Sequence, residues 1–192
     1  MKKVIIKSIE IANPDYYLTH FEQVLNHVLH RDSHLLSKGE LDLLAACKQS
    51  KVISRRLFAR LTCRVDNWQR TSKVNYIEIP EKEKYIEELC QIGWLRSWNG
   101  ERKFLPGILD TLNKKEISSF LNLSGKGVNA PVSTLKMILL EELSKEDSFQ
   151  LYDLWHQGDE SAELSVDKIL KDFDGWILLE HRRLIRTIFL LF

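Results

Sequence analysis

The sequence contains few of the residues on which secreted or membrane-spanning proteins depend. Its 192 residues include only three cysteines, Cys47, Cys63 and Cys90, which lie far apart and form no C-x-x-C pair. An odd number of separated cysteines excludes a disulfide framework, so we expect reduced thiols that act as small core residues in a reducing compartment. No apolar run approaches the length of a membrane span, and Val4–Ile6 is too short for a signal peptide. These absences predict a cytoplasmic or nucleoid protein, or a nuclear one in a eukaryote, with no membrane partner.

Familiar catalytic motifs are also missing. Gly-x-Ser-x-Gly does not occur, and Gly125-Lys126-Gly127 lacks the spacing of a P-loop, because Lys126 is followed by glycine and valine. Nucleotide hydrolysis is therefore set aside. Two interpretations of this loop stay open: a plain turn between two helices, or a loop whose backbone amides bind one phosphate together with Lys126 and Lys136.

Two further clusters are candidate metal sites. Glu101-Arg102-Lys103 has the Glu-x-Lys spacing of some metal-dependent nucleases, but no second carboxylate accompanies it on a neighbouring strand. We therefore favour a phosphate contact over catalysis there. His27, His30 and His34 lack a residue that would complete a four-ligand zinc site, and a histidine-rich helix face is predicted instead. No catalytic residue, metal or cofactor is assigned to this chain.

The apolar pattern of the first half predicts a winged-helix-like module within a mainly α fold. Asn13-Pro14 marks a helix start, and helices are predicted over 15–30, over 38–48 and, capped by Ser54 with Val65 facing inward, over 55–65. KVNYIEI, residues 73–79, predicts a short strand. A helix from Pro80 to Gly93 and a β-hairpin turning at Asn99-Gly100 complete the helix-turn-helix and wing.

The second half predicts further helices. Pro106-Gly107 breaks the pattern, and helices follow over 108–122, 131–143 and 144–157. A polar linker over 156–165 leads to a helix pair capped by Ser165. We divide the chain into a winged-helix-like module (13–105), a helix-loop-helix (106–145) and an acidic helical segment (146–192). Because the last residues, RRLIRTIFLLF, are strongly apolar, we expect this end to dock on the domain or to continue into a longer chain.

Charge is segregated along the chain although the net charge is only +1. Residues 50–73 contain seven basic residues and one acidic residue, whereas 141–174 contain eleven acidic residues and three lysines. Arg56, Arg60 and Arg64 recur every fourth residue and form one stripe on a helix. Arginine forks match phosphate geometry, so the stripe predicts phosphate contact; the alternative is a solvated helix face with carboxylate partners elsewhere.

Four separated segments resemble one known family. YYLTHFEQVLNHVL (16–29), RRLFARLTCRVDNW (55–68), KVNYIEI (73–79) and LCQIGWL (89–95) are similar, in this order, to the N-terminal region of Fanconi-associated nucleases. The resemblance covers residues 15–145 well and 177–192 more loosely. The residues that match the family pattern are Tyr16, Tyr17, Leu18, Phe21, Leu57, Phe58, Arg60, Leu61, Arg64, Trp68, Tyr76, Glu78 and Ile79.

The resemblance implies both an architecture and a role. Residues 105–145 would be a SAP-like DNA-binding helix-loop-helix with Leu112, Ile117, Leu121 and Leu135 in its core. Val132-Ser133 stand where SAP motifs usually carry a lysine, so Lys126 or Lys136 would have to substitute for it.

Family members are structure-selective DNA repair nucleases that cut 5′ flaps and act in cross-link repair. Their Mg²⁺- or Mn²⁺-binding carboxylates lie in a C-terminal virus-type nuclease domain, for which these 192 residues leave no room.

The resulting hypothesis is a DNA-binding, substrate-positioning region whose partners are branched or flap double-stranded DNA and the C-terminal nuclease part. The alternatives are a helical protein-protein interaction module and a winged-helix transcription regulator. The predicted DNA contacts are Arg55, Arg56, Arg60, Arg64, Arg70, Lys73, Lys126 and Lys136.

Overall fold

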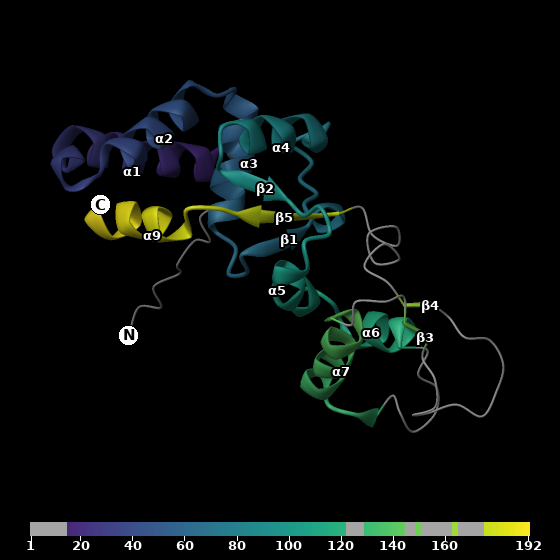
Figure 1. Cartoon of the computed structure of the whole chain (residues 1–192). Coiled ribbons are helices and arrows are strands. Elements are labelled where there is room, and N and C mark those ends of the chain that lie inside the picture. The colour runs from purple at the N-terminus through teal and green to yellow at the C-terminus, as the bar shows by residue number, and fades with distance from the viewer. Residues whose placement is uncertain (1–14, 122–128, 145–148, 151–162, 165–174) are drawn as a thin grey trace, which may run out of the picture. The chain divides into compact units, whose positions relative to one another are not determined.

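The computed structural model describes residues 15–121, 129–144, 149–150, 163–164 and 175–192. The chain forms two compact units, each assembled from separated segments (Figure 1). Unit 1 contains residues 1–65, 76–95 and 180–192, and unit 2 contains residues 66–75 and 96–179. The division into continuous segments over 13–105, 106–145 and 146–192 stays a prediction.

Unit 1 is helical, as predicted. Its elements are α1 (Tyr16–Arg31), a 3₁₀ turn η1 (Ser33–Leu35), α2 (Lys38–Gln49), α3 (Val52–Thr62), α4 (Lys82–Gln91) and α9 (Arg182–Leu191). A capping box between Ser37 and Glu40 begins α2, and only Ser50 and Lys51 separate α2 from α3. The mainly α class and the predicted helices over 15–30 and 38–48 are confirmed. Asn13 and Pro14 lie outside the described residues, and Asp15 is at the N-cap position of α1.

The core of unit 1 forms where α1 and α4 pack against α3. The Phe58 ring of α3 packs edge-on against the Phe21 ring of α1, with 5.3 Å between the ring centroids. It also packs against the Trp94 ring, with 4.6 Å between the centroids. The Trp94 indole N–H donates to the Leu43 carbonyl at 3.1 Å, so a fully buried tryptophan keeps its hydrogen bond. These contacts leave the arginines of α3 on the side of the helix away from the aromatic core.

The predicted ends of α3 are wrong. The helix begins at Val52, so Ser54 lies inside it, and its hydroxyl donates to Glu88 Oε2 of α4 at 2.8 Å. Glu88 also accepts the Lys51 backbone N–H at 3.1 Å and thereby caps α3 from a neighbouring helix, which the local sequence does not reveal. The helix ends at Thr62, and Val65, predicted to face inward, is 87% exposed.

The strand predicted over residues 73–79 is also wrong. Thr71–Lys73 form a 3₁₀ turn, η2, and the segment then continues without a strand, with Val74 and Ile79 buried and Ile77 fully exposed. Pro80 does not begin the next helix, because Glu81 adopts a left-handed conformation (φ 52°) and α4 starts at Lys82. Gly93, with φ 85°, ends that helix region as predicted.

Unit 2 combines short helices with a small sheet. Its elements are β1 (Trp68–Arg70), η2 (Thr71–Lys73), β2 (Leu95–Ser97, which starts in unit 1), η3 (Arg102–Phe104), α5 (Leu105–Asp110), α6 (Lys114–Phe120), α7 (Val132–Ser144), β3 (Phe149–Gln150), β4 (Glu163–Leu164) and β5 (Trp176–Leu179). The strand order is β1-β5-β2, with Trp68 opposite Leu178 and Arg70 opposite Trp176.

The predicted hairpin at Asn99-Gly100 is wrong. Gly100 does have φ 92°, but η3 follows it, and β2 is hydrogen-bonded to the distant β5. A local Asn-Gly signal specifies a turn, whereas the strand partner comes from long-range packing. The β element of the predicted winged fold is therefore present, but distant segments build it.

A core of tryptophan and aliphatic side chains fills unit 2. Leu112, Ile117, Leu121 and Leu135 are all buried, as the SAP-like prediction requires. Pro106 and Gly107 do not interrupt the helical structure but lie in the first turn of α5. Other members of this core are Trp68, Trp98, Leu105, Ile108, Leu109, Phe120, Leu139, Leu143 and Trp176.

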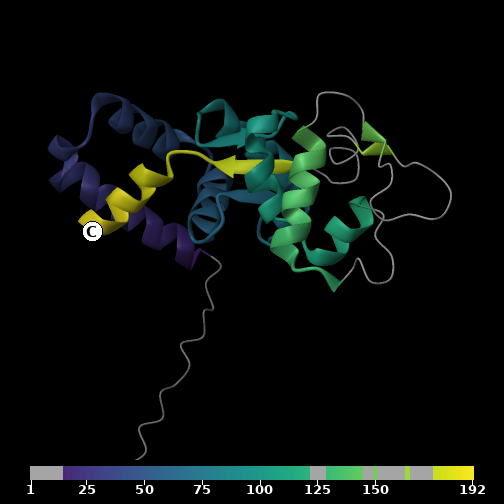
Figure 2. The same ribbon diagram turned by 60° about the horizontal axis from the view of Figure 1, so that its bottom comes forward.

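The helix predicted over 108–122 is two helices, because Asn113 starts α6 with a capping box to Glu116. The helix α7 agrees with the prediction over 131–143, and α6 packs beside it (Figure 2). Residues 149–150 and 176–179 are strands, which contradicts the helices predicted there. Most of 144–157, the Gly125–Gly127 loop and Ser165 lie outside the described residues, as does the predicted linker except for Glu163 and Leu164, which form β4.

The apolar C-terminal helix α9 docks within unit 1. It runs alongside α1 (Figure 1, Figure 2), and Leu184, Ile185 and Ile188 are buried. The predicted docking is confirmed. Leu190 and Phe192 remain 86% and 54% exposed, so part of the apolar surface of α9 faces solvent.

Candidate nucleic-acid interface

Two members of the predicted arginine stripe, Arg56 and Arg60, lie on α3, whereas Arg64 lies beyond its end. Arg55, Arg56 and Arg60 each have a carboxylate partner. Arg55 Nε donates to Glu22 Oε1 at 2.9 Å, and Arg55 Nη1 donates to the Ser50 and Lys48 carbonyls. Arg56 Nε donates to Asp15 Oδ1 at 2.5 Å, and its Nη1 donates to the Glu78 carbonyl at 3.3 Å. These two guanidinium groups therefore connect α3 to the start of α1 and to neighbouring chain segments.

Arg60 is held between two tyrosines. Its Cζ atom lies 3.9 Å from the centroid of the Tyr17 ring and 5.2 Å from that of Tyr76. Arg60 Nε and Nη2 both donate to Glu78 Oε1, at 3.0 and 2.5 Å. Burial alone would raise the pKa of Glu78, but hydrogen bonds from its own backbone N–H and from Arg60 hold this pKa below its usual value. The pair is therefore ionised at neutral pH.

Arg64 follows the end of α3. Its Nε donates to the Tyr76 hydroxyl at 3.1 Å, and its guanidinium lies 5.5 Å from the centre of that ring. Tyr76 thus contacts both Arg60 and Arg64 and fixes their spacing. The Arg64 carbonyl accepts a hydrogen bond from Arg182 of α9.

The sequence-predicted contacts in unit 2 differ strongly in exposure. Arg70, only 4% exposed, forms a two-point ion pair with Glu116 and donates to the Thr111 carbonyl at 2.8 Å. The hydrogen bond from Arg70 lowers the pKa of Glu116, although partial burial opposes this. Lys73, in contrast, is exposed. Arg70 therefore has a structural role in the core of unit 2.

Lys136 of α7 forms an ion pair with Asp110 at 3.0 Å. Lys126 lies outside the described residues. The eight predicted contacts therefore do not form one cluster: Arg55, Arg56, Arg60 and Arg64 belong to unit 1, and Arg70, Lys73 and Lys136 belong to unit 2.

The described residues do not fit a metal centre. Glu101 forms an ion pair with Lys103 on an exposed segment, and the hydrogen bond from Lys103 lowers the pKa of Glu101. Across residues 15–121, 129–144 and 175–192, no group of three His, Cys, Asp or Glu side chains could hold a metal ion.

The cysteines behave differently from one another. Cys47 is buried, and burial raises the pKa of its thiol to about 12, which agrees with the predicted inert core residue. Cys63 is exposed, so the prediction that it lies in the core is wrong, because α3 ends before it. Cys90 is half-buried.

The residues around the arginines were not predicted as site residues. In the sequence, Tyr17 and Tyr76 stand out only as matches to the family pattern, and no local pattern points to Asp15 or Glu22. The useful signal was the joint occurrence of Tyr17, Arg60, Tyr76 and Glu78 in that pattern, because a planar guanidinium both stacks on tyrosine and pairs with a carboxylate.

Comparison with known proteins agrees with this arrangement. Residues 15–96, which include α1 to α4 and the four α3-associated arginines, match the family described as "FAN1, HTH domain". This part of the chain is similar to the FAN1 helix-turn-helix domain. The resemblance to the N-terminal region of the Fanconi-associated nucleases is thereby confirmed.

Two kinds of relatives extend the comparison. The Fanconi-associated nuclease 1 homolog of Arabidopsis thaliana is 30% identical over 108 residues, which are 56% of this chain and 12% of that protein. Crystal structures of paFAN1 bound to 5′-flap DNA with a gap, one with a 2-nucleotide and one with a 1-nucleotide flap, both have a TM-score of 0.67. They are 23% and 22% identical and cover 93% of this chain.

The FAN1 fold therefore extends well beyond the helix-turn-helix domain. The chain spans 12% of the length of the curated relative and 29–30% of the crystallised chains.

None of the described helices is long and apolar enough to cross a membrane.

Proposed function

We propose that this chain is the DNA-binding, substrate-positioning region of a structure-selective DNA repair nuclease of the Fanconi-associated family. The observation that carries the proposal is the FAN1-type helix-turn-helix domain over residues 15–96, whose third helix carries a line of arginines. The similar crystal structures contain 5′-flap DNA, which favours a duplex with a flap as the ligand. Phosphate contacts position a protein on such a duplex without reading its sequence.

Arg60 and Arg64 are the proposed phosphate contacts of unit 1. Arg55 and Arg56 use their guanidinium nitrogens for carboxylates and carbonyls of their own unit, which favours a bracing role for both. Arg60 donates to Glu78 through Nε and Nη2, so its Nη1 can reach a phosphate oxygen. Because Tyr76 contacts both residues, the two guanidinium groups would be positioned before DNA binds.

Lys73 and Lys136, together with Lys126, form the proposed second set of contacts. Lys73 is exposed, and the ion pair between Lys136 and Asp110 involves an aspartate that is 76% exposed, so DNA could displace it at low cost. Arg70 is left out of the proposed contacts because its buried guanidinium is occupied by Glu116 and Thr111.

The test is the salt dependence of binding to a fluorescent 5′-flap duplex, measured by anisotropy with the whole chain. We expect affinity to fall steeply with salt, and Arg64→Ala to weaken binding and reduce the slope of log K against log salt by about 1. Arg31→Ala removes an exposed arginine from the end of α1 and is the matched control. Folded protein that shows no salt-dependent binding would reject the proposal.

A helical protein-protein interaction module is the second candidate. The observation that favours it is that Glu22, Asp15 and Glu78 already neutralise the three arginines of α3. If Arg64→Ala and Arg31→Ala have equal effects on DNA binding, this second candidate is preferred.

A further inference from the structure

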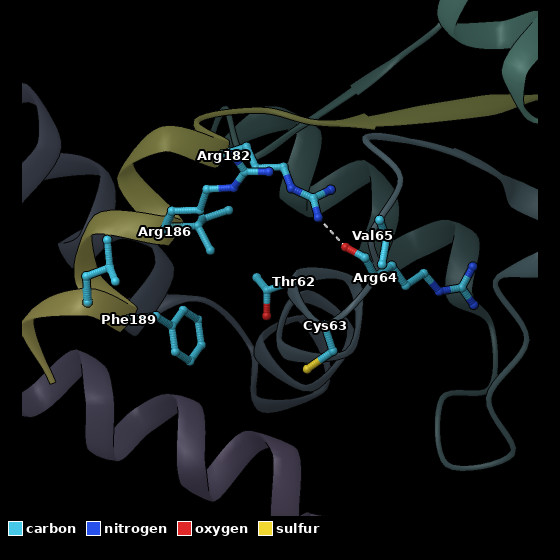
Figure 3. Close-up of a pocket in the computed structure, with 9 residues that line it drawn as sticks. Thr62, Cys63, Arg64, Val65, Arg182, Arg186 and Phe189 are labelled. Carbon is cyan, nitrogen blue, oxygen red and sulfur yellow. Dashed lines mark hydrogen bonds between the residues drawn. The ribbon is translucent and has the colours of Figure 1, made fainter.

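We propose that the pocket between the end of α3 and helix α9 is a docking site for an acidic peptide segment with apolar anchor side chains. The pocket lies entirely within unit 1 and has a volume of about 540 Å³. Its walls come from Thr62, the last residue of α3, with the following residues 63–65, and from the face of α9 that carries Arg182, Arg186 and Leu190 (Figure 3). That volume accommodates one or two side chains of a ligand.

The apolar part of the pocket is open to solvent. Val65 and Leu190 are 87% and 86% exposed, and Ile185 and Phe189 line the pocket with them. The apolar surface continues along α9 to Phe192, which is 54% exposed and lies against the His20 and His27 rings. Apolar anchor side chains of a partner can pack against such a strip and become buried from water.

The charged part of the pocket is basic. The described residues that line it include three arginines and no aspartate or glutamate. Arg182 donates to the Arg64 carbonyl, while the Arg64 side chain extends away from the pocket (Figure 3). Arg186 is exposed and has no carboxylate partner within the described part of the chain. The positive charge at the rim is therefore complementary to an acidic ligand.

Polar groups at the end of α3 bond within the protein. The Thr62 hydroxyl and the Cys63 thiol both donate to the Ala59 carbonyl, the Leu61 carbonyl accepts the Arg64 backbone N–H, and Arg182 donates to the carbonyl of Arg64. Arg186 remains for the carboxylates of a partner.

The lining favours a peptide over a nucleic acid strand. Binding of single strands relies on successive aromatic platforms along a basic track, whereas Val65, Ile185 and Leu190 are aliphatic. The Phe189 ring also packs against the Phe21 ring, with 6.4 Å between the ring centroids. A peptide that combines leucine or phenylalanine anchors with neighbouring acids matches both parts of the pocket.

The direct test uses a short fluorescein-labelled peptide in which glutamates flank a pair of leucines. Two further peptides carry lysines in place of the glutamates or alanines in place of the leucines, and a labelled oligothymidine represents nucleic acid. Binding to the whole chain is measured by anisotropy. In a Cys90→Ser background, protection of Cys63 from a thiol reagent reports whether the ligand occupies the pocket, because Cys47 is buried.

The expected result is saturable binding of the acidic leucine peptide with protection of Cys63, and weaker binding of the other three probes. Leu190→Asp and Val65→Asp change exposed residues and should weaken binding about tenfold or more. Arg186→Glu should weaken it roughly three- to tenfold. The matched controls Arg183→Glu, on the same helix, and Leu35→Asp, an exposed leucine of η1, should bind normally.

Three results would overturn the proposal: no binding of the acidic leucine peptide up to the millimolar range, equal loss in the control variants, or protection of Cys63 by oligothymidine instead. The pocket lining shares Arg64 with the proposed DNA contacts, whereas Arg60 lies outside it. Arg60→Ala should therefore weaken binding of the flap duplex without weakening binding of the peptide, and Arg186→Glu should weaken binding of the peptide.

Discussion

Arg60 in unit 1 and Arg70 in unit 2 each pair with a glutamate, yet the two pairs differ in surroundings. The Arg60 side chain is 23% exposed and lies between two tyrosine rings, whereas that of Arg70 is 4% exposed and also bonds a backbone carbonyl. A charge count treats both as members of one basic segment. Burial separates them: a partly exposed arginine can exchange partners with a phosphate, and a buried one cannot without unfolding its surroundings.

Removing Arg70 should have the largest effect on stability. Arg70→Ala leaves Glu116 partly buried without its counter-charge, and we expect a loss of about 3–5 kcal/mol in the free energy of unfolding. Urea denaturation followed by circular dichroism measures it. The double variant Arg70→Met, Glu116→Gln removes both charges while keeping an amide for the α6 cap, and should recover most of the loss. A mild effect of Arg70→Ala would mean that the pair is not buried.

Removing Arg60 should cost less. Arg60→Ala loses a partly exposed ion pair and the stacking on Tyr17, for which we expect about 1 kcal/mol in the same denaturation experiment. Arg60→Lys keeps the charge but loses the planar fork, so it should recover only part of the loss. If Arg60→Ala were as damaging as Arg70→Ala, the contrast between the two units would disappear.

The two glutamates should give the protein an acid-sensitive stability. The pKa values of Glu78 and Glu116 are lowered in the folded protein. A lowered folded-state pKa contributes stability that is present above the unfolded pKa of about 4.3 and is lost as pH falls through the folded pKa. Denaturation midpoints measured from pH 7 downward should decline below about pH 5. The decline should be shallower in the Arg70→Met, Glu116→Gln variant, and an equal decline would contradict this assignment.

The smallest effect on the free energy of unfolding is expected when Lys136 is replaced by alanine. Its ion-pair partner Asp110 is 76% exposed, so Lys136→Ala should change the free energy of unfolding by no more than about 0.5 kcal/mol. The same variant should weaken DNA binding if Lys136 contacts a phosphate. Normal binding together with normal stability would remove Lys136 from the proposed contacts.

The sequence predicted the mainly helical fold and most core positions, because apolar residues recur with helical spacing and pack in the same way in most contexts. It failed where structure depends on distant partners. β2 pairs with β5 rather than with a neighbouring segment, and Glu88 of α4 caps α3 in place of Ser54. The same limit applies to the candidate site: the spacing of Arg56, Arg60 and Arg64 was visible, but their acidic and aromatic partners were not.

The most direct test of the proposed DNA contact is a charge exchange between Arg60 and Glu78. The variant Arg60→Glu, Glu78→Arg preserves the ion pair and should retain most of the stability of the protein, while it moves the guanidinium away from α3. We expect the stably folded variant to bind the 5′-flap duplex more weakly, with a shallower salt dependence than the unaltered chain. Unchanged affinity in the folded variant would contradict a phosphate contact by Arg60 and leave it a purely structural residue.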